Sequence, residues 1–123
     1  QRFRSLPGRY AVCRLNPEAG VPAWAAGPFV NITRTAAELA IICPAERVPG
    51  EVRAERGWRV LKLVGPFPFT ATGVLSSIAQ PLARANISLL SIATYDTDYF
   101  LISVERFDEA VAVLTAAGHR KVR

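Results

Sequence analysis

Hydrophobic and polar positions follow a clear order in the second half of the chain. Trp58–Val64 alternates with a period of two residues, which predicts a strand, and the prolines of Gly65–Phe69 end it. A helical period then follows, with Thr70 or Thr72 as the predicted N-cap. The apolar positions of this predicted helix are Val74, Leu75, Ile78, Leu82 and Ala85.

Two residues bear on the course of this helix. Pro81 lies inside the pattern and removes one backbone hydrogen bond, which predicts a kink or a local break. Asn86 tolerates a left-handed backbone conformation, so it predicts the end of the helix.

A hairpin, a second helix and a short strand complete the second half. Ser88–Tyr95 and Tyr99–Val104 are rich in Ile, Leu and aromatic residues, and the Asp-Thr-Asp between them predicts a hairpin turn. The second helix is predicted to end at Gly118, before a last strand at His119–Val122. Its apolar face comprises Phe107, Ala110, Val111, Leu114 and Ala117.

The order strand, helix, strand, strand, helix, strand is typical of a ferredoxin-like (βαββαβ) unit, an antiparallel sheet with two helices on one face. The fold class predicted for residues 58–123 is therefore α+β. Residues 1–57 predict mainly strands, with at most a turn of helix at Pro22–Ala26 and a short irregular helix at Glu46–Arg56. The predicted strands are Arg2–Leu6, Tyr10–Leu15, Phe29–Arg34 and Leu39–Cys43.

We interpret residues 1–57 as a degenerate copy of residues 58–123. In this interpretation Arg2–Leu6 pairs with the next strand through the tight turn at Pro7-Gly8 and replaces the missing last strand of the copy.

Composition narrows the class of protein. Half of the 123 residues are hydrophobic, which is enough for a core. No apolar run reaches the ~18 residues of a membrane span, and no apolar stretch follows Arg2 and Arg4, so we expect a cytoplasmic protein without a signal peptide. The net charge of +5 comes from scattered arginines, and this pattern favours solvated surface charge over nucleic-acid binding.

Candidate chemistry is sparse. Cys13 and Cys43 lie in apolar runs and are interpreted as buried free thiols, with a disulfide as the alternative. His119 is the only histidine and, beside a basic tail, is expected to be solvated. No Ser/His/Asp set, Gly-rich phosphate loop or metal-ligand spacing is present, so we expect no enzyme, no catalytic residues, no cofactor and no metal.

Several tracts carry a resemblance to a known family. Thr72–Ala79 ("TGVLSSIA") and Leu82–Ile92 ("LARANISLLSI") resemble the ACT domains of aspartokinases. Ile92–Ile102 ("IATYDTDYFLI") resembles the tandem-ACT group that includes the vertebrate cytosolic arginine sensors, as do Leu6–Leu15 and Glu55–Arg59. The resemblance implies two ACT units that bind an amino acid or similar effector at an interface between units, in a regulatory protein that forms a homodimer. Where these sequences commonly have Gly and Ser or Thr, this chain has Asn86 and Ala93.

The resemblance makes the loop before the first helix a candidate ligand site. A helix start offers unpaired backbone N–H groups, which suit the carboxylate of an amino acid near Gly73 and Val74. The alternative is an ordinary connecting loop. The candidate ligand-binding residues of this loop are Gly65, Pro66, Phe67, Thr72, Gly73 and Val74.

The hairpin tip is the second part of the candidate site. Asp98 is the residue best suited to an amino or guanidinium group, since a carboxylate makes charge-assisted hydrogen bonds to either. The resemblance supports this role, because an acidic residue at the matching position of the arginine sensors contacts ligand. The alternative is turn chemistry, which Asp and Thr also favour. The candidate ligand-binding residues are Thr94, Tyr95, Asp96, Thr97 and Asp98.

Two other functions stay open. One is an interaction protein that dimerises and binds no metabolite. The other is an RNA-binding ferredoxin-like module, in which sheet aromatics such as Tyr95, Tyr99 and Phe100 would stack on bases, although the expected Gly-aromatic motif is absent. Trp24 and Trp58 are interpreted as packing residues.

Overall fold

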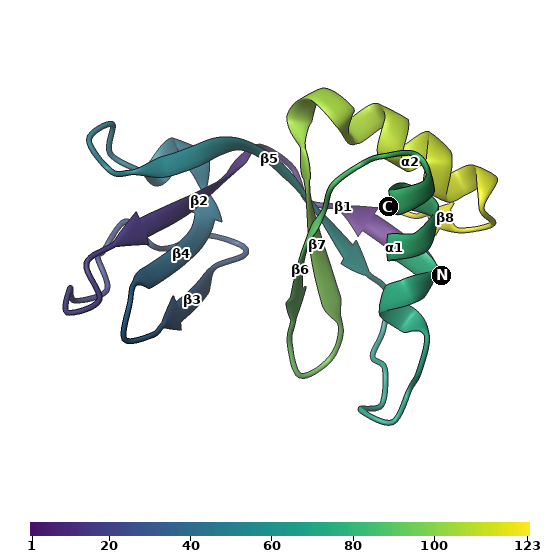
Figure 1. The fold of residues 1–123 in the computed structure, drawn as a ribbon, viewed down its shortest axis with the longest axis horizontal. Coiled ribbons are helices and arrows are strands. Elements are labelled where there is room, and N and C mark those ends of the chain that lie inside the picture. The colour runs from purple at the N-terminus through teal and green to yellow at the C-terminus, as the bar shows by residue number, and fades with distance from the viewer. The chain divides into compact units, whose positions relative to one another are not determined.

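A computed structural model describes all 123 residues, which form two compact units. We call Gln1–Pro7 together with Arg59–Arg123 the helical unit, and Gly8–Trp58 the strand unit. Strand β5 (Ala54–Leu63) belongs to both units, because its first residues lie in the strand unit and its last residues in the helical unit. Figure 1 shows the elements along the chain.

The helical unit has the ferredoxin-like pattern that the sequence predicts. Its sheet has the order β8-β1-β5-β7-β6. After β5 the chain forms α1 and the hairpin β6–β7, and then a short 3-10 turn leads into α2. The elements are β1 (Arg2–Ser5), α1 (Val74–Arg84), β6 (Leu90–Ala93), β7 (Asp98–Ser103), α2 (Phe107–Ala116) and β8 (Arg120–Lys121).

One core holds both helices against one face of this sheet (Figure 1). Alternate strand residues point to it, and α1 and α2 contribute the residues of their buried faces. Leu75, expected on the apolar face of α1, is instead 46% exposed. The buried side chains of this core are Phe3, Leu61, Leu63, Ile78, Leu82, Ile87, Phe100, Ile102, Phe107, Ala110 and Leu114.

The prediction that Arg2–Leu6 pairs with the next strand was wrong. Strand β1 pairs antiparallel with the end of β5, with Phe3 opposite Leu63, and parallel with β8. The reason is burial: the Phe3 ring is fully enclosed in the core of the helical unit. The N-terminal strand therefore completes the second unit and not the first.

The strand unit contains β2 (Tyr10–Leu15), β3 (Asn31–Arg34), β4 (Leu39–Pro44) and the start of β5. Its sheet order, β3-β4-β2-β5, repeats the order β6-β7-β5-β1 of the helical unit. It has no α-helix, so it is the degenerate copy.

The strand unit contains turns where the sequence allowed helix. At Pro22–Ala26, where at most a turn of helix was expected, the chain makes a turn in which Ala25 N–H donates to the Pro22 carbonyl at 3.1 Å. The predicted helix at Glu46–Arg56 was wrong, because a 3-10 turn at Ala45–Arg47 is followed by a loop and then by β5. The Arg56 guanidinium holds that loop by donating to the carbonyls of Val48, Pro49 and Val52, at 3.1, 2.8 and 3.0 Å.

Both cysteines lie in the core of the strand unit and are free, as the sequence predicted. Burial, together with the nearby Cys43 thiol, raises the pKa of Cys13 to about 11. Burial also raises the pKa of Cys43. Neither thiol is therefore ionised near neutral pH. Trp24 packs against the same core.

The helix ends are only partly as predicted. Asn86 (φ 63°) and Gly118 (φ 99°) end α1 and α2 in left-handed conformations. Each helix closes with the same pair of hydrogen bonds, which in α1 run from Asn86 N to Ala83 O and from Ile87 N to Leu82 O. Neither threonine caps α1, whose N-cap is Gly73 (φ 75°) without a side-chain hydrogen bond. Neither helix is long and apolar enough to cross a bilayer.

Pro81 does not break α1, which continues to Arg84. A proline has no N–H for the carbonyl four residues earlier, here that of Ser77. The His119 ring fills this place, with Nε2 at 2.8 Å from the Ser77 oxygen, while Nδ1 lies 2.8 Å from the Gln1 backbone nitrogen. The expectation that His119 is solvated was therefore wrong: it is only 8% exposed.

Candidate functional site

The loop between β5 and α1 meets the tip of the β6–β7 hairpin in the helical unit. The Phe67 N–H donates to the Asp96 carbonyl at 2.8 Å. The Thr97 hydroxyl donates to the Leu63 carbonyl at the end of β5, at 2.9 Å. Two hydrogen bonds thus join segments that are about thirty residues apart in the chain, and Figure 1 shows both segments extending in the same direction.

The two threonines of the hairpin tip have structural roles. The Thr94 N–H and hydroxyl both donate to the Thr97 carbonyl, at 2.9 and 2.8 Å, which closes the turn. Thr97 is only 6% exposed, and its hydroxyl is occupied by Leu63. The side chains of Thr94 and Thr97 therefore stabilise the turn, which is the alternative role considered for them above. Both also line the cavity described next.

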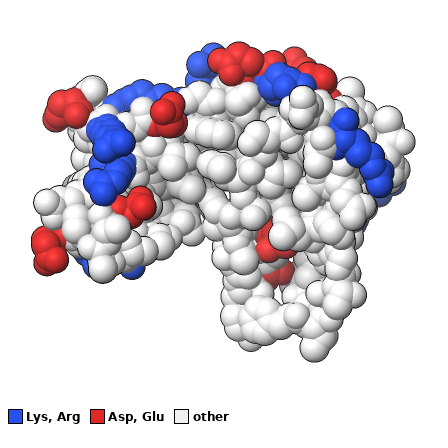
Figure 2. All heavy atoms as spheres, viewed as in Figure 1, with Lys and Arg blue, Asp and Glu red and all other residues white.

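A cavity of about 210 Å³, which we call the hairpin pocket, lies between the loop and the hairpin tip. Figure 2 shows acidic atoms set back in the hollow between these two projecting segments. Of the predicted residues, Gly65, Pro66, Thr72 and Gly73 lie outside its lining. The lining comprises Phe67, Pro68, Phe69, Ala71, Val74, Ala93, Thr94, Tyr95, Asp96, Thr97 and Asp98.

Aromatic side chains form the outer wall of the hairpin pocket. The rings of Phe69 and Tyr95 meet edge to face, with centroids 4.9 Å apart, although they come from the loop and the hairpin respectively. Both are largely exposed, at 76% and 79%. Phe100, an aromatic residue of β7, is instead buried in the core. Exposed rings of this kind are available to cover a ligand.

The two aspartates supply the charge of the hairpin pocket. Asp96 is exposed and Asp98 is half-buried, and neither forms an ion pair. Val74, the first residue of α1, lines the same pocket, and the first turn of α1 has no acidic residue. The pocket thus places two carboxylates without ion-pair partners near the start of a helix whose own first turn holds no acidic residue.

A second cavity, of about 300 Å³, adjoins the hairpin tip, and we call it the basic pocket. Gly65 and Pro66, predicted for the first site, line this one, together with Asp96 and Thr97. A Cβ on Gly65 would lie 3.1 Å from the Asp96 carbonyl oxygen, so the close approach of loop and hairpin favours glycine here. The other lining residues are Arg4, Lys62 and Val64.

Neither Arg4 nor Lys62 was among the predicted site residues. Lys62 is a charged residue between two apolar strand residues, Leu61 and Leu63, and Arg4 follows the apolar Phe3, which is the one signal that could have pointed to them. Arg4 and Lys62 lie opposite each other because β1 pairs with β5, whereas the sequence predicted that β1 pairs with β2.

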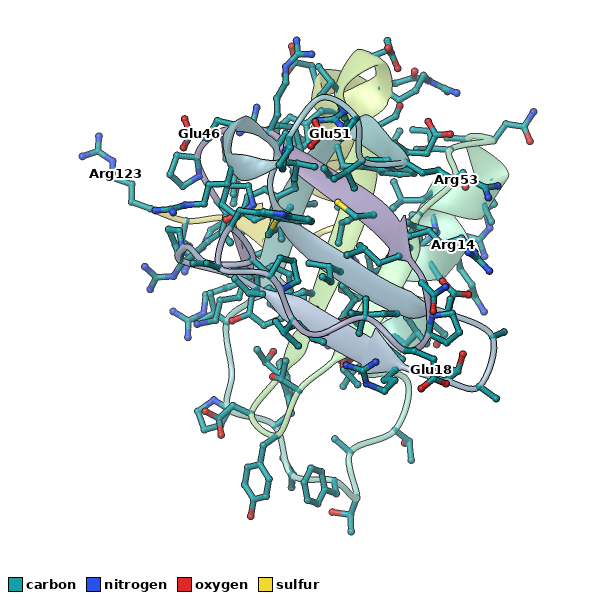
Figure 3. The ribbon with its side chains drawn as sticks, turned by 90° about the vertical axis from the view of Figure 1, so that its left-hand side faces the viewer. Arg14, Glu18, Glu46, Glu51, Arg53 and Arg123 are labelled. Carbon is teal, nitrogen blue, oxygen red and sulfur yellow. The ribbon has the colours of Figure 1, made fainter.

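A third cavity, of about 240 Å³, lies in the strand unit. Figure 3 shows Arg14 and Arg53 side by side at one edge of this unit, and both line the cavity. Glu38 and Glu55 line it as well, so its charges balance. The Arg14 guanidinium is also occupied, since it donates to the Ala37 carbonyl at 2.9 Å. No group of three or more His, Cys, Asp or Glu side chains could hold a metal ion.

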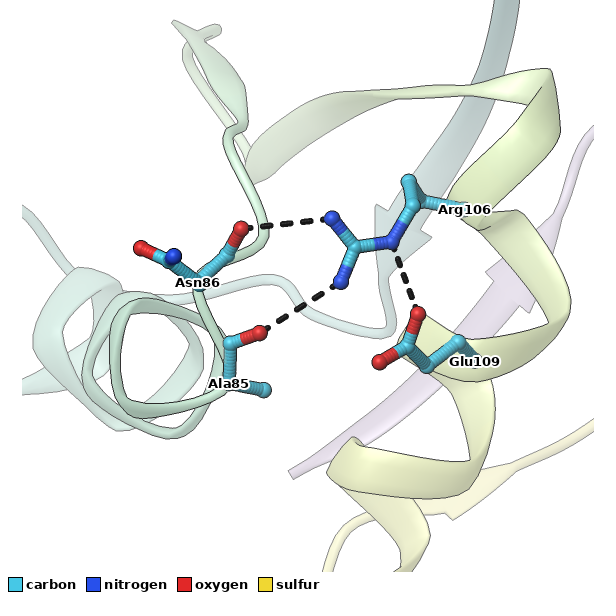
Figure 4. A network of polar contacts seen from close by, with 4 residues as sticks. All are labelled: Ala85, Asn86, Arg106 and Glu109. Atoms are coloured by element: carbon cyan, nitrogen blue, oxygen red, sulfur yellow. Dashed lines mark hydrogen bonds and ion pairs between the residues drawn. The ribbon is translucent and has the colours of Figure 1, made fainter.

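The one ion pair of the protein lies away from these cavities. Arg106 pairs with Glu109 at 2.7 Å and also donates to the Asn86 and Ala85 carbonyls at the end of α1, at 3.3 and 3.4 Å (Figure 4). The hydrogen bond from Arg106 lowers the pKa of Glu109. This network links the two helices and is structural.

Family models match both parts of the chain. A model described as an ACT domain matches residues 53–116. A second model, described as an N-terminal domain, matches residues 8–51.

Solved structures resemble the chain in sequence and fold, or in fold alone. A crystal structure of a protein from Agobacterium tumefaciens is 37% identical and has a TM-score of 0.92, over 98% of this chain and 91% of that one. The ligand-free regulatory subunit of aspartate kinase from Thermus thermophilus has a TM-score of 0.63 at 11% identity, over 90% of this chain and 93% of that one, which is a likeness of fold.

A curated relative matches only part of the chain. The Homo sapiens protein named cytosolic arginine sensor for mTORC1 subunit 1 is 34% identical over 58 residues, which are 46% of this chain and 18% of that protein. The chain thus spans less than a fifth of the length of the curated relatives it matches.

Proposed function

Because the chain belongs to the ACT domain family, we propose that it is a non-catalytic regulatory protein whose hairpin pocket binds a free amino acid. One observation carries the proposal. Two carboxylates without cationic partners, Asp96 and Asp98, line a pocket that has exposed aromatic rings at its rim. Such a pocket combines apolar cover with a few fixed charges, which is how small-ligand sites achieve affinity and orientation.

The charge of the hairpin pocket favours a ligand with a cationic side chain. Asp98 is half-buried, so its carboxylate is less screened than that of an exposed residue and suits an amino or guanidinium group. The backbone N–H of Val74, which lines the pocket at the start of α1, would receive the α-carboxylate of the ligand. A relative named as an arginine sensor supports this ligand class.

The regulatory step in this proposal is a change in assembly. Strand β6 is the outer strand of the sheet in the helical unit, and its Leu90 is 37% exposed. An outer strand offers unpaired backbone groups, so a second copy of the chain can extend the sheet there. A ligand that binds better to the paired arrangement shifts the population towards it.

Thermal unfolding against each of the twenty amino acids at millimolar concentration tests the proposal. A ligand at ~100 times its Kd adds about 2.7 kcal/mol of stability, which raises the Tm of a chain of this size by roughly 10 °C. We expect this response for a cationic amino acid, and we expect Asp98→Asn to abolish it while the fold is retained.

The matched control is Asp108→Asn, which removes the same charge from an exposed position in α2. It should keep the full response. A response to no amino acid would contradict the proposal and favour a pure interaction module. An Asp98→Asn protein that unfolds would show that Asp98 is a turn element, and an undiminished response in that variant would place the ligand elsewhere.

A further inference from the structure

Four basic side chains form a row across three strands of the helical unit. They belong to β8, β1 and β5, and they are Arg120, Arg2, Arg4 and Lys62. Phe3, between Arg2 and Arg4, points into the core beside the helices, so its two neighbours project from the opposite face of the sheet. We call this the open face.

The same alternation places the other two members on the open face. Lys62 lies between Leu61 and Leu63, which both point into the core. Arg120 follows His119, whose ring reaches α1. The row is therefore a set of neighbours on one face and not an accident of sequence spacing.

The register makes like charges face each other twice. Arg4 is directly opposite Lys62 in the antiparallel pair β1–β5. Arg2 is the partner of Arg120 in the parallel pair β1–β8. Like charges directly opposite each other on one face of a sheet are destabilising. The row is thus an electrostatically unfavourable arrangement that a bound anion would relieve.

No acidic side chain pairs with the row, since the single ion pair of the protein is that of Arg106. The Lys62 ammonium lies 5.8 Å from the centroid of the Tyr99 ring. An aromatic ring carries no net charge, so this contact does not neutralise the positive charge of Lys62. Arg4 and Lys62 line the basic pocket, whose volume of about 300 Å³ is large enough for a small ligand. Asp96 is the one carboxylate in that lining, so the pocket and the row together keep a positive excess.

We propose that the basic pocket and its row of cations form a second ligand site, for a small anion with several negative charges on carboxylate or phosphate groups. Arg4 and Lys62 bind one anionic group inside the pocket, and Arg2 and Arg120 bind another outside it. The site is separate from the hairpin pocket, and it stands even if that pocket binds no amino acid.

Thermal unfolding with citrate in one arm and pyrophosphate in the other tests the site, with the ionic strength held constant by sodium chloride. We expect at least one anion to raise the Tm, and the arm that responds identifies the group. Arg4→Gln and Lys62→Gln should each weaken the apparent affinity about tenfold or more, because each removes a charge-assisted contact. Without anion, Arg4→Gln should unfold at the same or a higher temperature, because it removes repulsion.

The control is Arg84→Gln, which removes the same charge from an exposed position of α1, in the other layer of the unit. It should respond to the anion as the wild type does, and so should Asp98→Asn. The proposal is overturned if sodium chloride alone gives the same rise in Tm, or if Arg84→Gln loses as much affinity as Arg4→Gln. It is also overturned if neither anion raises the Tm. Arg4-dependent binding of single-stranded RNA in that case would make the open face an RNA-binding surface.

Discussion

Replacing His119 by leucine should destabilise the helical unit because it leaves the Ser77 carbonyl without a partner. Pro81 cannot donate to that carbonyl, and the His119 ring now does so at 2.8 Å. A buried polar group left unsatisfied costs about 1–3 kcal/mol. The leucine also loses the contact of Nδ1 with the Gln1 backbone nitrogen, which adds to the cost.

A second substitution separates the two losses. Pro81→Ala restores an N–H that can donate to the Ser77 carbonyl, and alanine is favoured over proline in a helix interior by about 3 kcal/mol. In the Pro81→Ala protein, His119→Leu should therefore cost less than it does in the wild type. The loss at Gln1 is the same in both proteins and cancels in the comparison.

Urea unfolding followed by far-UV circular dichroism measures the free energy of unfolding of all four proteins. We expect a coupling of about 1 kcal/mol between the two positions, which exceeds the ~0.3–0.5 kcal/mol within which independent substitutions add. If His119→Leu costs the same in both proteins, the ring contributes through packing alone and the reasoning about the orphan carbonyl is wrong.

Three further predictions concern single contacts. Thr97→Val keeps the side-chain shape and removes the hydrogen bond to Leu63, so the free energy of unfolding in urea should fall by about 1–3 kcal/mol; an unchanged value would mean that the bond adds nothing. The Cys13 thiol keeps its proton in the folded state up to about pH 11, whereas an unfolded thiol ionises near 9, so the unfolded state binds fewer protons in this window and stability should fall as the pH rises through it. Cys13→Ala should reduce that slope in thermal unfolding at graded pH, and an identical slope would point to other groups. Since Arg106 lowers the pKa of Glu109, the pair stabilises the fold above the ordinary glutamate range and its contribution disappears as the pH falls through the lowered value; the Tm difference between the wild type and Glu109→Gln should shrink in acid, and a constant difference would contradict this.

Hydrophobic period and local end signals were sufficient to predict most of the helical unit. The order of strand, helix and hairpin followed from the spacing of the apolar residues, which recur every two residues in a strand and every 3.6 in a helix. This spacing can be read within a short window of sequence. Asn86 and Gly118 ended their helices as expected, because a left-handed residue depends on its own backbone freedom. The candidate residues Asp96 and Asp98 do lie together with Phe67 and Val74, since the order of elements already brings the loop and the hairpin tip to one end of the sheet.

Only the tertiary structure decided which strands pair and which polar groups meet. Phe3 lies sixty residues from its partner Leu63, and nothing local distinguishes that pairing from the tight turn that the sequence suggested. The opposition of Arg4 and Lys62 follows from that same pairing, so it could not be predicted before it. The sequence around His119 predicts a solvated side chain. Only the tertiary structure places its ring beside α1, where Pro81 leaves the Ser77 carbonyl without a backbone donor. Burial of Phe3 selects one pairing among several that local propensity permits, and this long-range choice is what places charges and hydrogen bonds at the two pockets.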